Sequence, residues 1–114
     1  MSIKVKFPAD GGKNLTVQVT GVIDKDLEFQ VLFKAERRFR IDSVLFSLQE
    51  KMGVLLWWDE KNLILPLESR GYFSFVCPIT PDDKWEKTLY ISTLGVEVGP
   101  CPKHFYFTLD CEKL

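Results

Sequence analysis

The sequence has little of the residue types that most catalytic sites require. It contains a single histidine, His104, so any catalytic dyad or triad that needs histidine would have to use this residue. It has no GxxxxGK(S/T) phosphate loop, no GxGxxG, no HExxH and no GxSxG. The paired acids Asp59-Glu60 and Asp82-Asp83 have the context of turns and helix caps, where acids serve solvation and capping. We therefore predict no enzymatic activity, no catalytic residue, no metal and no cofactor.

Long apolar runs and an excess of charge of one sign are also lacking. All apolar runs are shorter than the roughly 18 to 20 residues that span a bilayer, and the opening MSIKVKFPADGG contains no signal-peptide apolar segment. A formal net charge of -1 and a pI near 5.8 give no overall basic field that would attract nucleic acid. We expect a cytoplasmic protein that does not bind nucleic acid.

Cysteine is scarce and is not arranged for cross-linking. Cys77, Cys101 and Cys111 are odd in number and have no CxxC spacing, which fits neither a disulfide framework nor a zinc knuckle. Free thiols in a reducing compartment are expected. The 114 residues, 46% of them hydrophobic and 27% charged, suit a single globular domain spanning 1–114.

Two segments near the start alternate apolar and polar residues with the period of a half-buried strand. These are NLTVQVT, at 14–20, and LEFQVLFK, at 27–34, in which Leu27, Phe29, Val31 and Phe33 share one parity. Residues 1–13 are expected to be an N-terminal arm, which could also form an edge strand because Ile3, Val5 and Phe7 alternate too. A short turn would make the two segments an antiparallel pair.

The pattern then changes to a helical one. Ile41, Val44, Leu45, Leu48 and Met52 fall at i, i+3, i+4, i+7 and i+11, the spacing of one stripe on an amphipathic helix. Such a helix would cover about 40–52 and end at Gly53.

The next stretch, VLLWWDEKNLILPL, predicts a strand, a turn and a short second strand. Neighbouring side chains of a strand point to opposite faces, and counting from Val54 sends Trp58 inward and Trp57 outward. Residues 68–84 predict an inserted loop that ends in a short helix starting near Thr80, and HFYFTLDC predicts a last strand. Strand pairs around one main helix predict an α+β fold of the ubiquitin-like β-grasp type, with a mixed sheet.

The most charged local feature is the segment KAERRFR. It sets four cations, Lys34, Arg37, Arg38 and Arg40, against one acid, Glu36. It can be a solvated connection, or a basic patch that meets an acidic partner or a phosphoinositide head group.

Several motifs together resemble the start of the kindlins, the FERM-domain adaptors that activate integrins. The segments ADGGKNLTVQVTGVIDKDLEFQV, VLFSLQEKMG and LLWWDEK follow the order and approximate spacing of that family, as do WEKTLYISTLGVEV and KHFYFT further on. The distinctive residues of this resemblance are Trp57, Trp58, Lys61, Thr88, Leu89 and Gly95.

The resemblance implies the N-terminal F-zero subdomain of such an adaptor, which has a ubiquitin-like fold and no catalytic activity. Implied partners are a Rap- or Ras-class small GTPase, acidic phosphoinositides and adhesion proteins such as paxillin, at the inner face of the plasma membrane. By location, beside the second strand, the expected partner-binding residues are Lys25, Gln30, Lys34, Arg37, Arg38 and Arg40. The domain is expected to be a monomer.

Two other interpretations remain open from the residues. One is a homotypic scaffold that assembles head to tail, with KAERRFR meeting an acidic patch of the next copy. The other is a peptide-binding ubiquitin-like domain in which GYFSFVCPI docks the ligand.

Overall fold

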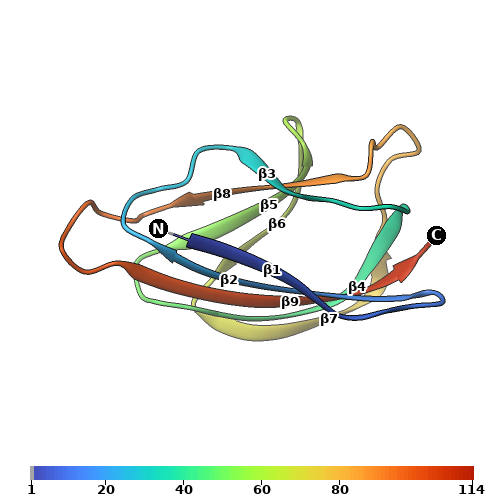
Figure 1. Ribbon diagram of the computed structural model, residues 1–114, viewed down its shortest axis with the longest axis horizontal. Helices are drawn as coiled ribbons and strands as arrows, with labels where there is room; N and C mark the ends of the chain where they lie inside the picture. Colours follow the sequence, from blue (N-terminus) through green and yellow to red (C-terminus); the bar gives the residue numbers. More distant parts are fainter. Residues whose placement is uncertain (1) are drawn as a thin grey trace.

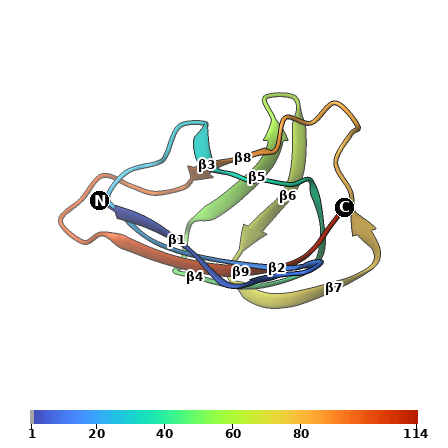
Figure 2. The same cartoon turned by 45° about the vertical axis from the view of Figure 1, so that its right-hand side comes forward.

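A computed structural model describes residues 2–114, and in this range the chain forms nine β-strands and no helix (Figures 1 and 2). All the strand pairings are antiparallel. The strands are β1 (Ser2–Gly11), β2 (Asn14–Ile23), β3 (Gln30–Lys34), β4 (Phe39–Leu48), β5 (Gly53–Asp59), β6 (Asn62–Glu68), β7 (Arg70–Ile79), β8 (Thr88–Leu94) and β9 (Lys103–Lys113).

The strands lie in two sheets that pack face to face. One sheet has the order β1-β2-β9-β4-β7 and the other the order β3-β8-β5-β6. From β2 onward every connection crosses from one sheet to the other, except the β5–β6 hairpin. This path, with β2-β9-β4-β7 opposite β3-β8-β5-β6, is that of an eight-stranded jelly roll to which β1 adds an edge strand.

The core lies between the sheets and is built by alternation along each strand. In the central strands β2 and β9, every second side chain is buried, among them Val17, Val19, Phe107 and Leu109. Sheets that face water on one side show this period of two.

The predicted ubiquitin-like α+β fold is wrong, because the segment expected to be its helix is strand β4. One extra residue, Asp42, sits between Ile41 and Ser43 where the register against β9 shifts, a β-bulge. The buried apolar positions are Phe39 and Ile41 before the bulge and Val44, Phe46 and Leu48 after it. The shift puts Ile41 and Val44 three apart, and Leu45, which is exposed on the outer face, completes the apparent helical stripe.

Other segments can also be compared with the expectation. Of the two alternatives for the N-terminal segment, an arm or an edge strand, the structure has the edge strand β1, which pairs with β2 along most of its length. The stretch 68–84, expected to be a loop, contains β7, which pairs with β4. No helix follows Thr80; the chain there makes a turn in which Asp82 accepts from the main-chain N–H of Lys84.

Candidate functional site

A row of apolar side chains crosses the outer face of the four-stranded sheet. In the strand registers Val31 of β3 lies opposite Tyr90 of β8, Tyr90 opposite Trp57 of β5, and Trp57 opposite Leu63 of β6. Directly opposed residues lie on the same face, with Cβ atoms about 4.5 to 5.5 Å apart. The four side chains therefore form one continuous row across the whole sheet.

Phe29, just before β3, packs on this row. Its ring stacks on Tyr90 with centroids 4.7 Å apart and meets Trp57 edge to face at 5.9 Å. The Trp57 indole Nε1 donates to Ser92 Oγ at 3.0 Å, which fixes the ring against β8. The aromatic side chains are thus held in one arrangement before any ligand binds.

We call Phe29, Val31, Leu55, Trp57, Leu63 and Tyr90 the aromatic face. It contains no charged residue, and it is open to solvent: Val31 is 57% exposed and Leu63 45%. By strand alternation, the polar side chains Thr88 and Ser92 of β8 and Asp59 of β5 share the surface and lie along its borders. A contiguous apolar surface with a polar border is a mark of an interaction site.

The opposite orientations of the two adjacent tryptophans are confirmed. Trp58 is buried, while Trp57 is only partly buried and lies on the outer face. The residues above Trp58 are Phe39 of β4, at a centroid distance of 5.8 Å, and Trp85, at 4.6 Å, instead of a helix. Alternation within one strand was enough to assign the faces, although it could not identify the neighbours.

Sequence reasoning missed Phe29, Val31 and Tyr90 as members of this surface. Alternation put Phe29 and Val31 on the same side as Leu27 and Phe33, but Leu27 and Phe29 precede β3 and a bulge lies between Val31 and Phe33, so the four do not share one face. Leu27 and Phe33 are buried, whereas Phe29 and Val31 are exposed. Their proximity to Tyr90 depends on the pairing of β3 with β8, about sixty residues further along the chain. The periodicity within one segment does not predict which distant strand it pairs with.

All three predicted partner-binding arginines are engaged within the protein. The Arg38 guanidinium donates to the main-chain carbonyls of Asp82 and Pro81 and lies near the Asp83 carboxylate. Arg40 pairs with Asp42 at 3.2 Å and with Glu112 at 2.9 Å. Arg37 donates to the carbonyl of Leu114 at 2.8 Å.

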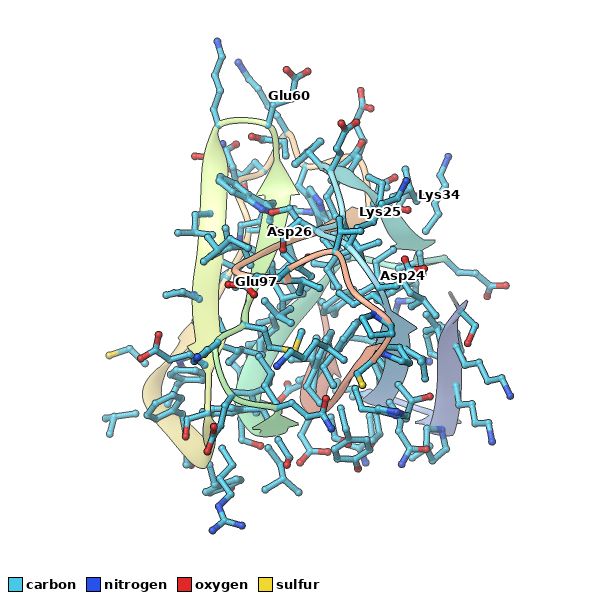
Figure 3. All side chains as sticks on the ribbon, turned by 90° about the vertical axis from the view of Figure 1, so that its left-hand side faces the viewer. Asp24, Lys25, Asp26, Lys34, Glu60 and Glu97 are labelled. Carbon is cyan, nitrogen blue, oxygen red and sulfur yellow. The ribbon has the colours of Figure 1, made fainter. Side chains whose placement is uncertain are left out.

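The other predicted partner-binding residues are exposed and lie elsewhere. Lys25 lies between Asp24 and Asp26 on the β2–β3 connection, and Lys34 lies at the end of β3 (Figure 3). Gln30, at the start of β3, donates to the carbonyl of Glu28 at 3.3 Å. Gln30 and Lys34 are thus on the four-stranded sheet and Lys25 is on the connection that leads to it, whereas Arg40 pairs on the outer face of β4 and β9 in the other sheet. The six predicted partner-binding residues therefore do not form one patch.

The remaining residues of the kindlin resemblance lie in the β5–β6 turn, on strand β8 or just after it. Lys61 lies in the β5–β6 turn, where Asp59 accepts hydrogen bonds from the Asn62 side chain and the Lys61 N–H, and these lower the Asp59 pKa. Thr88 and Leu89 are on β8, and Leu89 is fully buried. Gly95 has a φ of 86°, and a Cβ there would lie 2.5 Å from the Lys51 carbonyl oxygen.

Titratable and nucleophilic groups are dispersed. His104 is exposed at the start of β9, and burial raises the pKa of the Cys111 thiol, which stays neutral. Among residues 2–114, no group of three or more His, Cys, Asp and Glu side chains is placed to hold a metal ion. The same residues include no helix long and apolar enough to cross a membrane.

A cleft of about 250 Å³ lies where the edge of β1 meets the basic segment. Lys34, Arg37 and Lys113 line it together with two acids, Asp10 and Glu36. Lys113 pairs with Asp10, and Arg37 is held by the Leu114 carbonyl. Because its charges are largely compensated within the protein, the cleft is a weaker candidate than the aromatic face.

Comparisons with known proteins do not assign this chain to a family. No protein-family model matches the chain, and no curated protein does. A solved structure of a cupin-superfamily protein from Desulfitobacterium hafniense aligns over 95% of this chain and 76% of its own, with 8% identity and a TM-score of 0.37. At that level the likeness carries no argument about function.

The kindlin resemblance is wrong. It requires a ubiquitin-like fold with a helix where this chain has β4, and no kindlin or FERM protein is among the matches. The adhesion-adaptor function and the ubiquitin-like scaffold alternative are wrong as well, because both require that fold. The GTPase, phosphoinositide and paxillin partners rested on that resemblance and on a basic patch whose arginines are engaged internally, so we do not carry them forward.

Proposed function

We propose that this domain is a non-catalytic protein-interaction module whose aromatic face forms the centre of an interface with an apolar protein surface. The observation that carries the proposal is the unbroken row from Val31 through Tyr90 and Trp57 to Leu63. Tryptophan, tyrosine and phenylalanine are enriched at interface centres, where charged residues are depleted.

The packing within the face supports the same conclusion. Phe29, Tyr90 and Trp57 hold one another in place, so binding costs little side-chain entropy. Aromatic anchors of this kind carry most of the binding energy at interfaces.

The surroundings of the rings favour a protein over a sugar. Aromatic rings also stack on carbohydrates, but the polar groups Thr88 and Asp59 lie at the borders and Ser92 already accepts from the Trp57 indole, whereas Val31, Leu55 and Leu63 surround the rings. Aliphatic neighbours complement an apolar protein surface.

The experiment compares two variants at exposed positions. Val31→Glu combined with Leu63→Glu places two charges on the aromatic face, and Val76→Glu places one on β7, outside it. A photo-crosslinking residue at position 31 identifies a bound protein, which is then purified and titrated directly. We expect the double variant to weaken binding by at least about 30-fold, because a buried unpaired charge is costly, and Val76→Glu to leave binding unchanged.

Three results would overturn the proposal. The purified partner could bind the double variant as tightly as the wild type. It could lose affinity only with Val76→Glu. A glycan screen could instead find a sugar that binds the wild type and loses affinity when Trp57 or Phe29 is replaced by alanine, which would make the face a carbohydrate site.

A further inference from the structure

Strand β7 forms one edge of the five-stranded sheet (Figure 2). It exposes apolar side chains along its length. Tyr72 is 59% exposed, Phe73 51% and Val76 99%. Residues Arg70–Ser74 pair regularly with β4, which leaves the other side of this stretch without a strand partner in the described chain. An exposed apolar edge of this kind is a template for pairing with another strand.

The other three sheet edges carry features that discourage pairing. Strand β1 contains Lys4, Lys6 and Pro8, and β6 contains Pro66 and ends in Glu68. Strand β3 has only five residues, with a bulge and a terminal lysine. Lysine, proline, short length and bulges are the usual means of protecting an edge.

Strand β7 is protected only in its second half. Its register against β4 jumps from Ser74 to Ile79, so the bulged residues 75–78 have no register partner on β4. In the regular half, Arg70–Ser74, the only charge is Arg70 at its start, and there is no proline. That half is the stretch available for strand addition.

We propose that the regular half of β7 pairs with the same strand of a second copy of this chain, antiparallel about a two-fold axis at Tyr72. A continuous sheet requires that opposed residues face the same way, so that each residue meets one of equal parity. About Tyr72, Phe73 lies opposite the second copy's glycine at position 71, and Arg70 lies opposite its serine at position 74. This proposal replaces the expectation of a monomer, and it differs from head-to-tail assembly because the axis is two-fold.

Self-complementarity within the strand argues for a second copy as the occupant. Gly71 has no side chain that could clash with the second copy's Phe73, and the Phe46 ring of the same chain already covers it, so the two aromatic rings can pack together there. The only charge in the regular half, Arg70, meets a neutral serine, so two copies do not place like charges directly opposite each other.

The buried area sets the strength of the dimer. Tyr72 and Phe73, each about half exposed, can each bury about 100 Å². With Leu45, which lies beside Tyr72 and is 48% exposed, and with the strand backbone, two copies would bury on the order of 1,000 Å². That is near the lower limit of specific interfaces, so we expect a weak dimer, with a Kd on the order of 10 μM.

Disulfide trapping tests the register. In a background with the exposed cysteines replaced (Cys77→Ser and Cys101→Ser), Arg70→Cys and Ser74→Cys are made as separate proteins and then mixed. Opposed Cβ atoms are close enough for a disulfide, whereas either variant alone puts its two thiols four positions apart, roughly 13 Å. We expect cross-linked dimers in the mixture and none from either protein alone. Cross-linking by Ser74→Cys alone, or none in the mixture, would overturn the proposal.

Sedimentation velocity at protein concentrations between about 1 and 200 μM tests whether β7 is the dimer surface. The wild type should shift from monomer to dimer, and Tyr72→Lys should remain monomeric while its thermal unfolding stays within a few degrees, because the position is solvated. Val31→Glu with Leu63→Glu, on the aromatic face, should dimerise as the wild type does. A monomeric wild type throughout, or a dimer lost only in the aromatic-face variant, would show that β7 is not a dimer surface.

Discussion

Trp85 donates its indole Nε1–H to the main-chain carbonyl of Trp58 at 3.0 Å, and the two ring centroids lie 4.6 Å apart. The same Nε1–H also lies 2.7 Å from the carbonyl of Thr88. Phe39 meets both indole rings, so three aromatic side chains close one end of the sandwich. The connection between β7 and β8 is therefore anchored in the core.

Trp85→Phe should lower the free energy of unfolding by about 1 to 3 kcal/mol, because one buried and one partly buried main-chain carbonyl lose their shared donor. The matched control is Trp57→Phe, which removes one hydrogen bond on the outer face and should cost less than about 1.5 kcal/mol. Urea unfolding followed by circular dichroism measures both, independently of tryptophan fluorescence. Equal losses in the two variants would contradict the anchoring role.

Arg38→Gln should destabilise the domain by about 1 to 2 kcal/mol. Its guanidinium donates to the main-chain carbonyls of Pro81 and Asp82. Hydrogen bonds that involve a charged group contribute more than neutral ones, but the partial exposure of the Arg38 side chain reduces this contribution. Lys25→Gln, at an exposed loop position, should change stability by less than about 0.5 kcal/mol. Thermal unfolding gives the comparison, and limited proteolysis near Pro81 should be faster only in the Arg38 variant. If neither measurement separates the two variants, Arg38 is only a solvated charge.

Gly95→Ala should be among the more damaging small substitutions. The φ of 86° costs a residue with a side chain about 1 to 2 kcal/mol, and the new Cβ would collide with the Lys51 carbonyl. Gly11→Ala is the control, because a Cβ there meets no atom within 4 Å, and it should stay within about 0.5 kcal/mol of the wild type. Chemical denaturation that ranks the two variants in the reverse order would refute this reading of the turn.

Asn62→Ala should raise the pKa of Asp59 toward its usual value of about 3.9, because the Asn62 side chain is the main cause of the lowered pKa. A carboxyl with a pKa lowered by folding stabilises the fold when ionised. That contribution is present above the unfolded pKa and is lost as the pH falls through the folded pKa. NMR titration of the Asp59 carboxyl in the wild type and the variant measures the shift, with Asn14→Ala as a distant control. An unchanged pKa in Asn62→Ala would assign the effect to the main-chain donors instead.

Parts of the fold could be predicted from the sequence wherever a strand is regular. The alternation in β2 and β9, and the opposite facing of Trp57 and Trp58, follow from the two-residue period of an extended chain. The helix at 40–52 failed because the bulged residue Asp42 put Ile41 and Val44 three apart, while Leu45, which is exposed, and Met52, beyond the end of β4, happened to complete a helical spacing. The arginines of KAERRFR gave no local sign that their partners lie near the end of the chain and in the loop around Asp82.

The sequence by itself determined which side chains of a regular strand lie together on one face, and it contained none of the common catalytic motifs we sought. The tertiary structure alone decided that Val31, Tyr90, Trp57 and Leu63 form one row, that β7 is an edge, and that Arg38 supports a loop. The physical reason is the range of the interactions. Side-chain alternation is set within a few residues, whereas register, bulges and edges depend on which distant strands pair, and that is fixed by packing of the whole core.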